Sequence, residues 1–289
     1  MCVTCGCSDN NDAKITNPVT GEVDDHHDHI HTHTLPDGTV ITHTHHHDQH
    51  HDHDQDTAPH IHAKIHNTTI SLEQEILGKN NLIAAQNRGW FKGRNILALN
   101  LMSSPGAGKT TLLTRTINDL KQQLNISVIE GDQETTNDAQ KIKETGCKVI
   151  QINTGTGCHL DAAMIDRGLQ QLNPPLNSVV MIENVGNLVC PALFDLGEQA
   201  KVVILSVTEG EDKPIKYPHM FRASEMMILT KIDLLPYVQF DVQRCIEYAK
   251  QVNPTIKIFQ VSATTGAGLE NWYSWLTQEV GSLTNLTPV

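Results

Sequence analysis

The sequence of 289 residues has no apolar run that approaches the roughly 20 residues needed to cross a membrane. Its N-terminus also lacks the basic segment followed by an apolar segment that marks a secretory signal peptide. We therefore expect a cytoplasmic protein with no membrane partner. Thiols stay reduced in the cytosol, where clustered cysteines more often bind metal than form structural disulfides.

Basic residues are scarce at the start of the chain, where residues 1–66 contain only Lys14 and Lys64 against eleven Asp and Glu residues. This segment carries a net charge of −9, out of −12 for the whole chain. Nucleic-acid binding depends on Lys and Arg side chains that neutralise phosphates. The charge balance therefore argues against a nucleic-acid partner.

Residues 1–66 also contain little that could build a core, but they hold fifteen of the seventeen histidines. The histidines gather in tracts at 24–34, 42–54 and 60–66. Because so few apolar side chains cannot offset the conformational entropy of ordering, we predict that residues 1–66 form a disordered metal-binding tail. Imidazoles at this density can bind several borderline cations at neutral pH, and a merely solubilising tail is the alternative.

The composition changes after this tail. Residues 67–94 are expected to form a helical lead-in, since apolar side chains recur there at roughly helical spacing. Residues 95–289 alternate β-branched runs with helical patterns, which predicts an α/β fold with a mostly parallel sheet flanked by helices. The strand-like runs are 95–103, 126–131, 148–153, 178–184, 201–207, 226–232 and 256–262. Helical patterns include 111–124, 160–172 and 241–252.

The first of these strands leads into SSPGAGKTT (103–111) and then a helix, which is the setting of a phosphate loop. Small residues let backbone N–H groups surround phosphate oxygens, and the helix N-terminus adds its positive dipole end. Lys109 is expected to reach the β- and γ-phosphates, and the Thr110 hydroxyl to bind Mg²⁺. The other loop residues expected at the nucleotide are Ser104, Pro105, Gly106, Ala107, Gly108 and Thr111. An ordinary glycine-rich turn is the alternative.

Two later strand ends resemble guanine-binding motifs. In TKID (230–233), Asp233 would accept the base N–H donors and Lys231 would pack beneath the base, while Thr230 departs from the usual Asn. VSATTG (261–266) resembles the loop that contacts the guanine carbonyl. Its contacting residues would be Ser262, Ala263 and Thr264. A carboxylate suits the donors of guanine, although an ATP-dependent protein of the same class remains an alternative.

A further strand end, IENVG (182–186), resembles a DxxG motif in which Glu183 replaces Asp and the Gly186 amide contacts the γ-phosphate. Asn187 follows where many GTPases place the Gln that orients water, so we expect slow hydrolysis of GTP to GDP and phosphate. Asp132 in GDQETTND (131–138) is a candidate Mg²⁺ group together with Glu183, and a solvated acidic loop is an equal alternative for it. Lys109, Thr110, Asp132 and Glu183 are thus the predicted catalytic residues.

Thiol and imidazole groups lie close to these motifs in sequence. Cys158 and His159 follow the third strand, and Cys190 lies seven residues past Glu183. Thiolate and imidazole are ligands for Zn²⁺ or Ni²⁺, and a buried small hydrophobe is the alternative for Cys190. Cys147 and Cys245 have no other ligand type near them in sequence, so we expect them to be structural.

From residue 95 onward the chain resembles the HypB family, the nickel-insertion GTPases of [NiFe]-hydrogenase maturation. Besides the motifs above, the resemblance rests on TGTGCHLDA (154–162), ENVGNLVCPA (183–192) and EGEDKPIKYP (209–218). An N-terminal CxxCGC motif and a histidine-rich tract, both found here, also occur in that family.

The resemblance implies a P-loop GTPase of the SIMIBI type that uses GTP and Mg²⁺ and becomes a homodimer when GTP binds. It implies a Ni²⁺ or Zn²⁺ site at the dimer interface on Cys158, His159 and Cys190, and places Lys213 near the nucleotide. It also implies a nickel site on Cys2, Cys5 and Cys7. The implied partners are other hydrogenase maturation proteins and the hydrogenase large-subunit precursor, which receives the nickel. A nickel store and a urease-type nickel-insertion GTPase are the alternatives.

Overall fold

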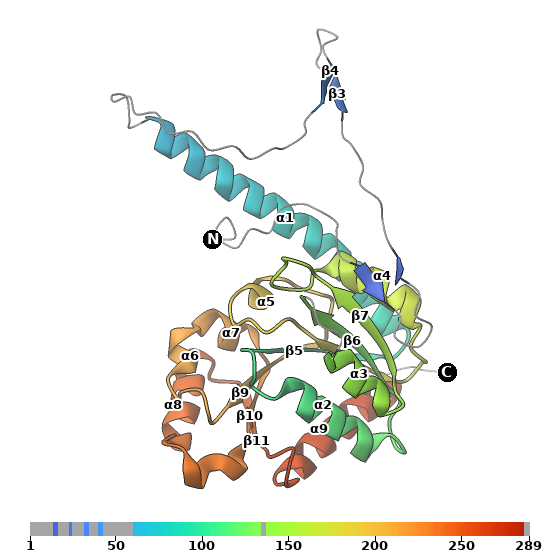
Figure 1. The fold of residues 1–289 in the computed structure, drawn as a ribbon, viewed down its shortest axis with the longest axis vertical. Coiled ribbons are helices and arrows are strands. Elements are labelled where there is room, and N and C mark those ends of the chain that lie inside the picture. Colours follow the sequence, from blue (N-terminus) through green and yellow to red (C-terminus); the bar gives the residue numbers. More distant parts are fainter. Residues whose placement is uncertain are drawn as a thin grey trace.

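A computed structural model of the chain describes residues 14–16, 23–24, 32–34, 40–42, 60–133 and 137–285 (Figure 1). For the described residues up to 73 and for 284–285 only the backbone is described. The predicted nickel ligands Cys2, Cys5 and Cys7 and most of the predicted tail lie outside the described residues.

The centre of the fold is a sheet of seven parallel strands in the order β11-β10-β9-β5-β8-β6-β7. These strands are β5 (Leu97–Ser103), β6 (Ile126–Asp132), β7 (Lys148–Asn153), β8 (Val179–Glu183), β9 (Ala200–Ser206), β10 (Met226–Thr230) and β11 (Lys257–Gln260). Each coincides with a predicted strand-like run to within a few residues, so the prediction of a parallel α/β sheet is confirmed. The long β-branched runs arise because these strands are covered on both faces.

Short segments ahead of residue 60 complete the strand list. β1 (Lys14–Thr16) pairs antiparallel with the edge strand β7, and β2 (Val23–Asp24) pairs with β1. β3 (Thr32–Thr34) and β4 (Val40–Thr42) pair with each other in a separate two-stranded sheet.

Helices cover both faces of the sheet (Figure 1). One face carries α2 (Lys109–Leu120), α3 (Asn137–Glu144) and α9 (Leu269–Asn285). The other carries α1 (His60–Gly93) and α4 (Ala162–Leu172) over one half. Over its second half lie α5 (Cys190–Leu193), α7 (Pro218–Ala223) and α8 (Val242–Val252). α6 (Lys213–Lys216) and the 3₁₀ helix η2 (Ile232–Tyr237) lie in the connections.

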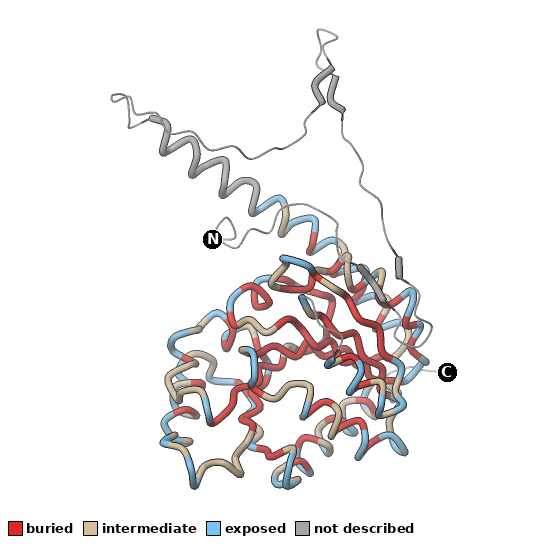
Figure 2. Tube along the Cα trace, in the orientation of Figure 1, coloured by how far each residue is buried: buried red, intermediate tan, exposed pale blue. Residues whose placement is uncertain are grey.

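The core is built from side chains that alternate along each strand, as the pleat requires. On β5, Leu97, Leu99 and Leu101 pack under α2 and α9, whereas Ala98 and Met102 face the opposite helices. Figure 2 shows the resulting continuous buried strands at the centre of the domain. Such a rigid sheet fixes the positions of the loops at its carboxyl edge, where the predicted motifs lie.

α1 differs from its predicted extent, because it begins at His60 and runs to Gly93. The apolar spacing in the sequence predicted helix only from residue 67. No glycine or proline occurs between 60 and 77 to stop the helix. Gly78 lies inside the helix, and a methyl group added there would have no neighbour within 4 Å. In the described part of the chain, no helix combines the length and apolar character that a membrane span requires.

Candidate functional site

The predicted phosphate loop connects β5 to α2 and has the backbone conformation that a phosphate cradle needs. Gly106 and Gly108 have φ angles of 76° and 96°, in the left-handed region that favours glycine. α2 begins at Lys109, so its first N–H groups open toward the loop. The Lys109 ammonium donates a hydrogen bond to Ser103 Oγ at 2.9 Å. The loop therefore presents backbone donors and one cation to the same space.

Thr110 and Glu183 meet at this loop. The Thr110 hydroxyl donates to Glu183 Oε1 at 2.7 Å, and Glu183 ends the adjacent strand β8. Glu183 is buried, and its Oε2 has no hydrogen-bond partner among the described residues. Burial raises the pKa of Glu183, while Lys109 and the Thr110 hydroxyl act in the opposite direction. A hydroxyl and a carboxylate oxygen, which are hard oxygen donors, are what Mg²⁺ prefers.

A second buried carboxylate, Glu130, was not among the predicted site residues. Glu130 on β6 is the register partner of Glu183 on β8, and its Oε2 also lacks a hydrogen-bond partner within the described chain. Burial, followed by the charges of Glu183 and Asp132, raises the pKa of Glu130 to about 9. Two neighbouring buried carboxylates, each with one oxygen that lacks a partner, fit a divalent cation. The sequence signal that could have identified Glu130 is an acidic residue inside a strand of β-branched residues.

Asp132 ends β6 on the same side of the sheet, and its Oδ1 accepts the Gln133 N–H at 2.8 Å. Its charge and that of Asp138 on α3 both act on Glu130 and Glu183. The structure thus brings Asp132 near the carboxylate pair.

Gly186 lies directly against the phosphate loop. A Cβ atom added there would come within 3.1 Å of Pro105 Cγ and 3.2 Å of its backbone N and Cα. A side chain at this position would force one of the two loops to shift by a few tenths of an ångström. Gly186 therefore lies beside the phosphate loop, and its predicted contact with a γ-phosphate stays a prediction.

Glu209, which was not among the predicted site residues, links the phosphate loop to the end of β9. Its carboxylate accepts hydrogen bonds from the Ser104 hydroxyl in the phosphate loop and from the Ser206 N–H at the end of β9. Lys213 Nζ lies 3.8 Å from Glu209 Oε2 and above the Tyr217 ring. Lys213 is thereby connected to the phosphate loop through one carboxylate.

The TKID segment packs on the phosphate loop through its first two residues. The Thr230 hydroxyl donates to the Ala107 carbonyl at 2.6 Å, and the Lys231 ammonium donates to the Gly106 carbonyl at 2.7 Å. Thr230 is buried and occupies the position where guanine motifs usually carry Asn. Its hydroxyl makes the hydrogen bond to the phosphate loop from this position. Asp233 follows in the first turn of η2.

The loop after β11 lies beside α2. Ser262 is buried, and its Oγ accepts the Thr265 N–H at 3.1 Å, which holds the turn. The Ala263 carbonyl accepts a hydrogen bond from Arg115 of α2 at 3.1 Å, and Thr264 is exposed. Residues 262–264, which are predicted to contact the base, therefore lie next to α2, the helix that follows the phosphate loop.

The three predicted metal ligands of the domain form one cluster. The ligand atoms of Cys158, His159 and Cys190 all lie within 4.8 Å of one another, and Cys158 Sγ is 3.7 Å from His159 Nδ1. His159 is buried against the Phe194 ring, with centroids 3.8 Å apart. Burial lowers the pKa of His159, which favours the neutral imidazole that binds metal. Two thiols and one imidazole suit Zn²⁺ or Ni²⁺.

The remaining described cysteines are structural, as expected. Cys245 is completely buried in the core under α8, and burial raises the pKa of its thiol to about 12. Cys147 packs against the opposite core, and burial raises its pKa as well.

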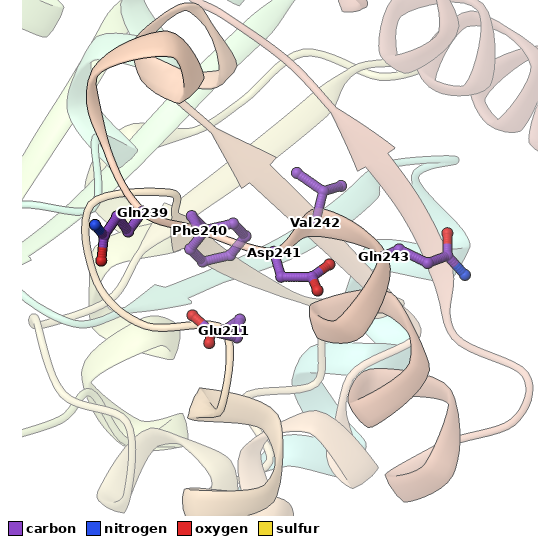
Figure 3. A pocket seen from close by; sticks show the side chains of 6 residues that line it. All are labelled: Glu211, Gln239, Phe240, Asp241, Val242 and Gln243. Carbon is purple, nitrogen blue, oxygen red and sulfur yellow. The ribbon is translucent and has the colours of Figure 1, made fainter.

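A pocket of about 750 Å³ lies away from these groups, between the loop before α6 and the segment that leads into α8 (Figure 3). Its lining residues are Glu211, Gln239, Phe240, Asp241, Val242 and Gln243. None of them belongs to the predicted nucleotide or metal site.

The parallel sheet, the phosphate loop and the strand-end motifs define a nucleotide-binding protein of the P-loop class. A family model described as "CobW/HypB/UreG, nucleotide-binding domain" matches residues 97–260. The chain belongs to this family, in its HypB branch, as the predicted resemblance stated.

Individual relatives agree with this assignment. The chain is 57% identical over 217 residues to the hydrogenase maturation factor HypB of Rhizobium leguminosarum bv. viciae, covering 75% of this chain and 73% of that protein. It is 44% identical over 320 aligned residues to HypB of Cupriavidus necator, covering 96% and 88%. The crystal structure of HypB from Helicobacter pylori in complex with nickel superposes with a TM-score of 0.66 at 36% identity, covering 71% of this chain and 96% of that one.

Proposed function

We propose that this protein is a GTP-hydrolysing nickel metallochaperone that loads Ni²⁺ into a hydrogenase large-subunit precursor. The proposal rests on one short segment, residues 186–190, which reaches both the phosphate loop and the metal-ligand cluster. Gly186 contacts the phosphate loop at Pro105, and Cys190, four residues later, joins Cys158 and His159 in the thiol–imidazole cluster. Nucleotide state and metal binding therefore act on the same loop.

The nucleotide chemistry follows from the groups around the phosphate loop. The backbone N–H groups of the loop and Lys109 bind the phosphates, and Asp233 selects guanine. Mg²⁺ supplies charge neutralisation at the phosphates, with Thr110, Glu183, Asp132 and Glu130 as the groups that hold it. Asn187 stands where a water-orienting Gln is common, which supports a slow reaction.

Nickel is the cargo of this reaction rather than a resident cofactor. Three ligands leave the coordination shell incomplete, and a second copy of the chain can complete it. The exposed apolar side chains of Val189 and Leu193 flank Cys190, which supports a homodimer that forms with GTP and shares the metal site. Zn²⁺ suits the same ligands and would compete with Ni²⁺ there.

The N-terminal segment adds metal capacity in this proposal. Cys2, Cys5 and Cys7 form a nickel site, and the histidine tract holds a reserve. Partner maturation proteins would then receive or supply nickel.

The decisive experiment is a titration with Ni²⁺ and Zn²⁺ in the presence of GDP or a non-hydrolysable GTP analogue, with the oligomeric state followed in parallel. The proposal expects the analogue to change both the metal affinity and the monomer–dimer equilibrium. Identical affinities in the two nucleotide states would contradict it.

A nickel store is the second candidate, favoured by the density of histidines in residues 24–66. Deletion of residues 24–66 separates the two. A store would lose its function, whereas a chaperone would lose capacity and keep GTP-dependent transfer of nickel.

A further inference from the structure

The C-terminal part of α1 lies across the two segments that carry the metal ligands. Figure 1 shows this end of α1 beside α4, and the two helices pack together. Asn80 and Asn87 are seven residues apart, so they lie on one side of the helix. Both are buried, which is unusual for Asn side chains unless their amides are hydrogen-bonded.

Asn80 contacts one residue from each ligand segment. Its Oδ1 accepts the Ala162 N–H at 2.9 Å, and its Nδ2 donates to the Asp195 carbonyl at 2.8 Å. Ala162 lies three residues after His159, and Asp195 lies five residues after Cys190. One amide thus joins the Cys158–His159 loop to the segment that follows α5.

Asn87, about two helical turns further along α1, makes a similar bridge. Its Nδ2 donates to the Ala162 carbonyl at 2.8 Å and to the Leu196 carbonyl at 3.1 Å. Both backbone polar groups of Ala162 are therefore held by α1. Arg88 adds two hydrogen bonds to the Asp195 carboxylate, at 2.6 and 2.7 Å.

The approach of this segment to α1 is as close as the backbone permits. Gly197 has a φ angle of 88°, and a Cβ atom added there would lie 2.6 Å from the Ala84 carbonyl oxygen and from Asn87 Cβ. Glycine at this position lets the segment after α5 contact the helix backbone directly. The contact is therefore built into the sequence of both segments.

Asn184, next to Glu183, contacts the Cys158–His159 segment directly and is linked to the segment after α5 through Asn100. Its Oδ1 accepts the Leu160 N–H at 3.1 Å, and its Nδ2 donates to Asn100 Oδ1 at 3.1 Å. Asn100 in turn donates to Glu198 Oε1 at 3.1 Å. Hydrogen bonds from α1 and from Asn184 thus hold the two ligand segments in place.

From this arrangement we propose that Asn80 and Asn87 are positioning residues of the metal site. By fixing the separation of the Cys158–His159 loop and the Cys190 segment, they set the metal affinity of the cluster. The inference rests on the proposed binding of Ni²⁺ or Zn²⁺ by that cluster. Neither asparagine belongs to the ligand cluster, so the effect passes through the position of the backbone segments.

The test uses the full chain with Cys2→Ser, Cys5→Ser and Cys7→Ser, so that thiolate-to-metal absorption reports only on the remaining cysteines. Asn87→Leu keeps the side-chain size and removes both hydrogen bonds. Asn253→Leu is the matched control, because Asn253 Nδ2 also donates to two carbonyls, those of Phe221 and Ser224, beside α8. Titrations with Ni²⁺ and with Co²⁺ follow the absorption band, and GDP binding is measured in parallel.

We expect Asn87→Leu to weaken Ni²⁺ binding about tenfold or more, by analogy with the loss of groups that orient metal ligands. Asn253→Leu should leave Ni²⁺ affinity unchanged, and both variants should bind GDP normally. Equal Ni²⁺ affinity in Asn87→Leu and Asn253→Leu would overturn the positioning role. A parent chain without any thiolate band would instead overturn the metal site itself, together with this inference.

A second measurement does not depend on a variant that folds. If α1 fixes the ligand segments, then bound metal must stabilise α1 in return, because the coupling is reciprocal. Ni²⁺ should slow hydrogen exchange at amides 80–91 of the parent chain and leave α8 unchanged. Exchange in α1 that is insensitive to Ni²⁺ would contradict the proposal.

Discussion

Glu130 and Glu183 are register partners on the adjacent strands β6 and β8, and each buries a carboxylate oxygen without a hydrogen-bond partner in the described part of the chain. Two such groups repel each other when both are ionised. A cation between them removes the repulsion. This pair therefore makes both stability and divalent-cation binding depend on the same two side chains.

Glu130→Gln should stabilise the metal-free protein at high pH. The pKa of Glu130 is about 9 in the folded protein, above its unfolded value, so the folded state binds more protons between pH 4.5 and 9. Stability from this group is present below pH 4.5 and is lost as the pH rises toward 9. In thermal unfolding with a chelator present, the free energy of unfolding of the variant should rise relative to that of the parent chain as the pH increases. The difference should grow by at most about 1.4 kcal/mol per pH unit.

Glu198→Gln is the control for this effect, since Glu198 is also buried but accepts the Leu196 N–H and lies 3.7 Å from Lys201. Burial raises the pKa of Glu198 as well, but Lys201, Asn100 and the Leu196 N–H act in the opposite direction, so Glu198→Gln should gain less stability at high pH than Glu130→Gln. Added Mg²⁺ should then stabilise the parent chain more than Glu130→Gln. Equal stabilisation by Mg²⁺ in both would remove Glu130 from the cation site.

Asp233→Asn should change the preferred base. The carboxylate of Asp233 is proposed to accept two N–H groups of guanine, and hydrogen bonds to a charged group contribute about 1.5–3 kcal/mol each. We expect GDP affinity to fall at least about tenfold and xanthosine diphosphate, which offers a carbonyl at the same position, to bind better than GDP. Equilibrium binding with labelled nucleotides measures both.

Asp241→Asn is the matched control, because Asp241 caps α8 by accepting the Arg244 N–H at 2.9 Å. Asn is an equally good helix cap. If both variants kept the parent preference for GDP, the assignment of Asp233 to the base would be wrong.

Cys190→Ala should abolish tight metal binding by the domain and its dependence on nucleotide, while GDP affinity stays within about threefold. The reason is that one of the three donors that cluster in the described part of the chain is lost. The comparison is Cys245→Ala in the core, which should cost stability and leave metal binding intact. Metal titrations in the background without Cys2, Cys5 and Cys7 provide the readout. A Cys190→Ala chain that still bound nickel in a GTP-dependent way would refute the coupling.

Local sequence patterns were sufficient to predict the strands and the phosphate loop. Each parallel strand is a short apolar run, most of them rich in β-branched residues, and Gly106 and Gly108 mark the left-handed positions of the loop. Cys158, His159 and Cys190 were also predicted together, because thiol and imidazole groups stand near nucleotide motifs. These features depend on residue type and spacing over short distances.

Other site residues could not be predicted, because their roles depend on the order of strands in the sheet. Glu130 and Glu183 are 53 positions apart and meet only because β8 lies between β5 and β6. Asn80 and Asn87 look like ordinary polar residues of a surface helix until the segment after α5 is placed against them. Glu209 likewise acquires its role through the Ser104 hydroxyl, which comes from another strand end.

Gly186→Ala should separate GTP from GDP recognition. The added methyl group meets the backbone N and Cα of Pro105 at 3.2 Å, so the γ-phosphate loop must move away from the phosphate loop. We expect affinity for a GTP analogue to fall about tenfold, with GDP affinity changed less than threefold. Gly78→Ala in α1, where an added methyl group has open space, should leave both affinities unchanged. Because Cys190 follows on the same loop, Gly186→Ala should also make nickel affinity the same with GDP and with the GTP analogue. A variant that lost analogue binding but kept a nucleotide-dependent nickel affinity would show that the two sites communicate by another route.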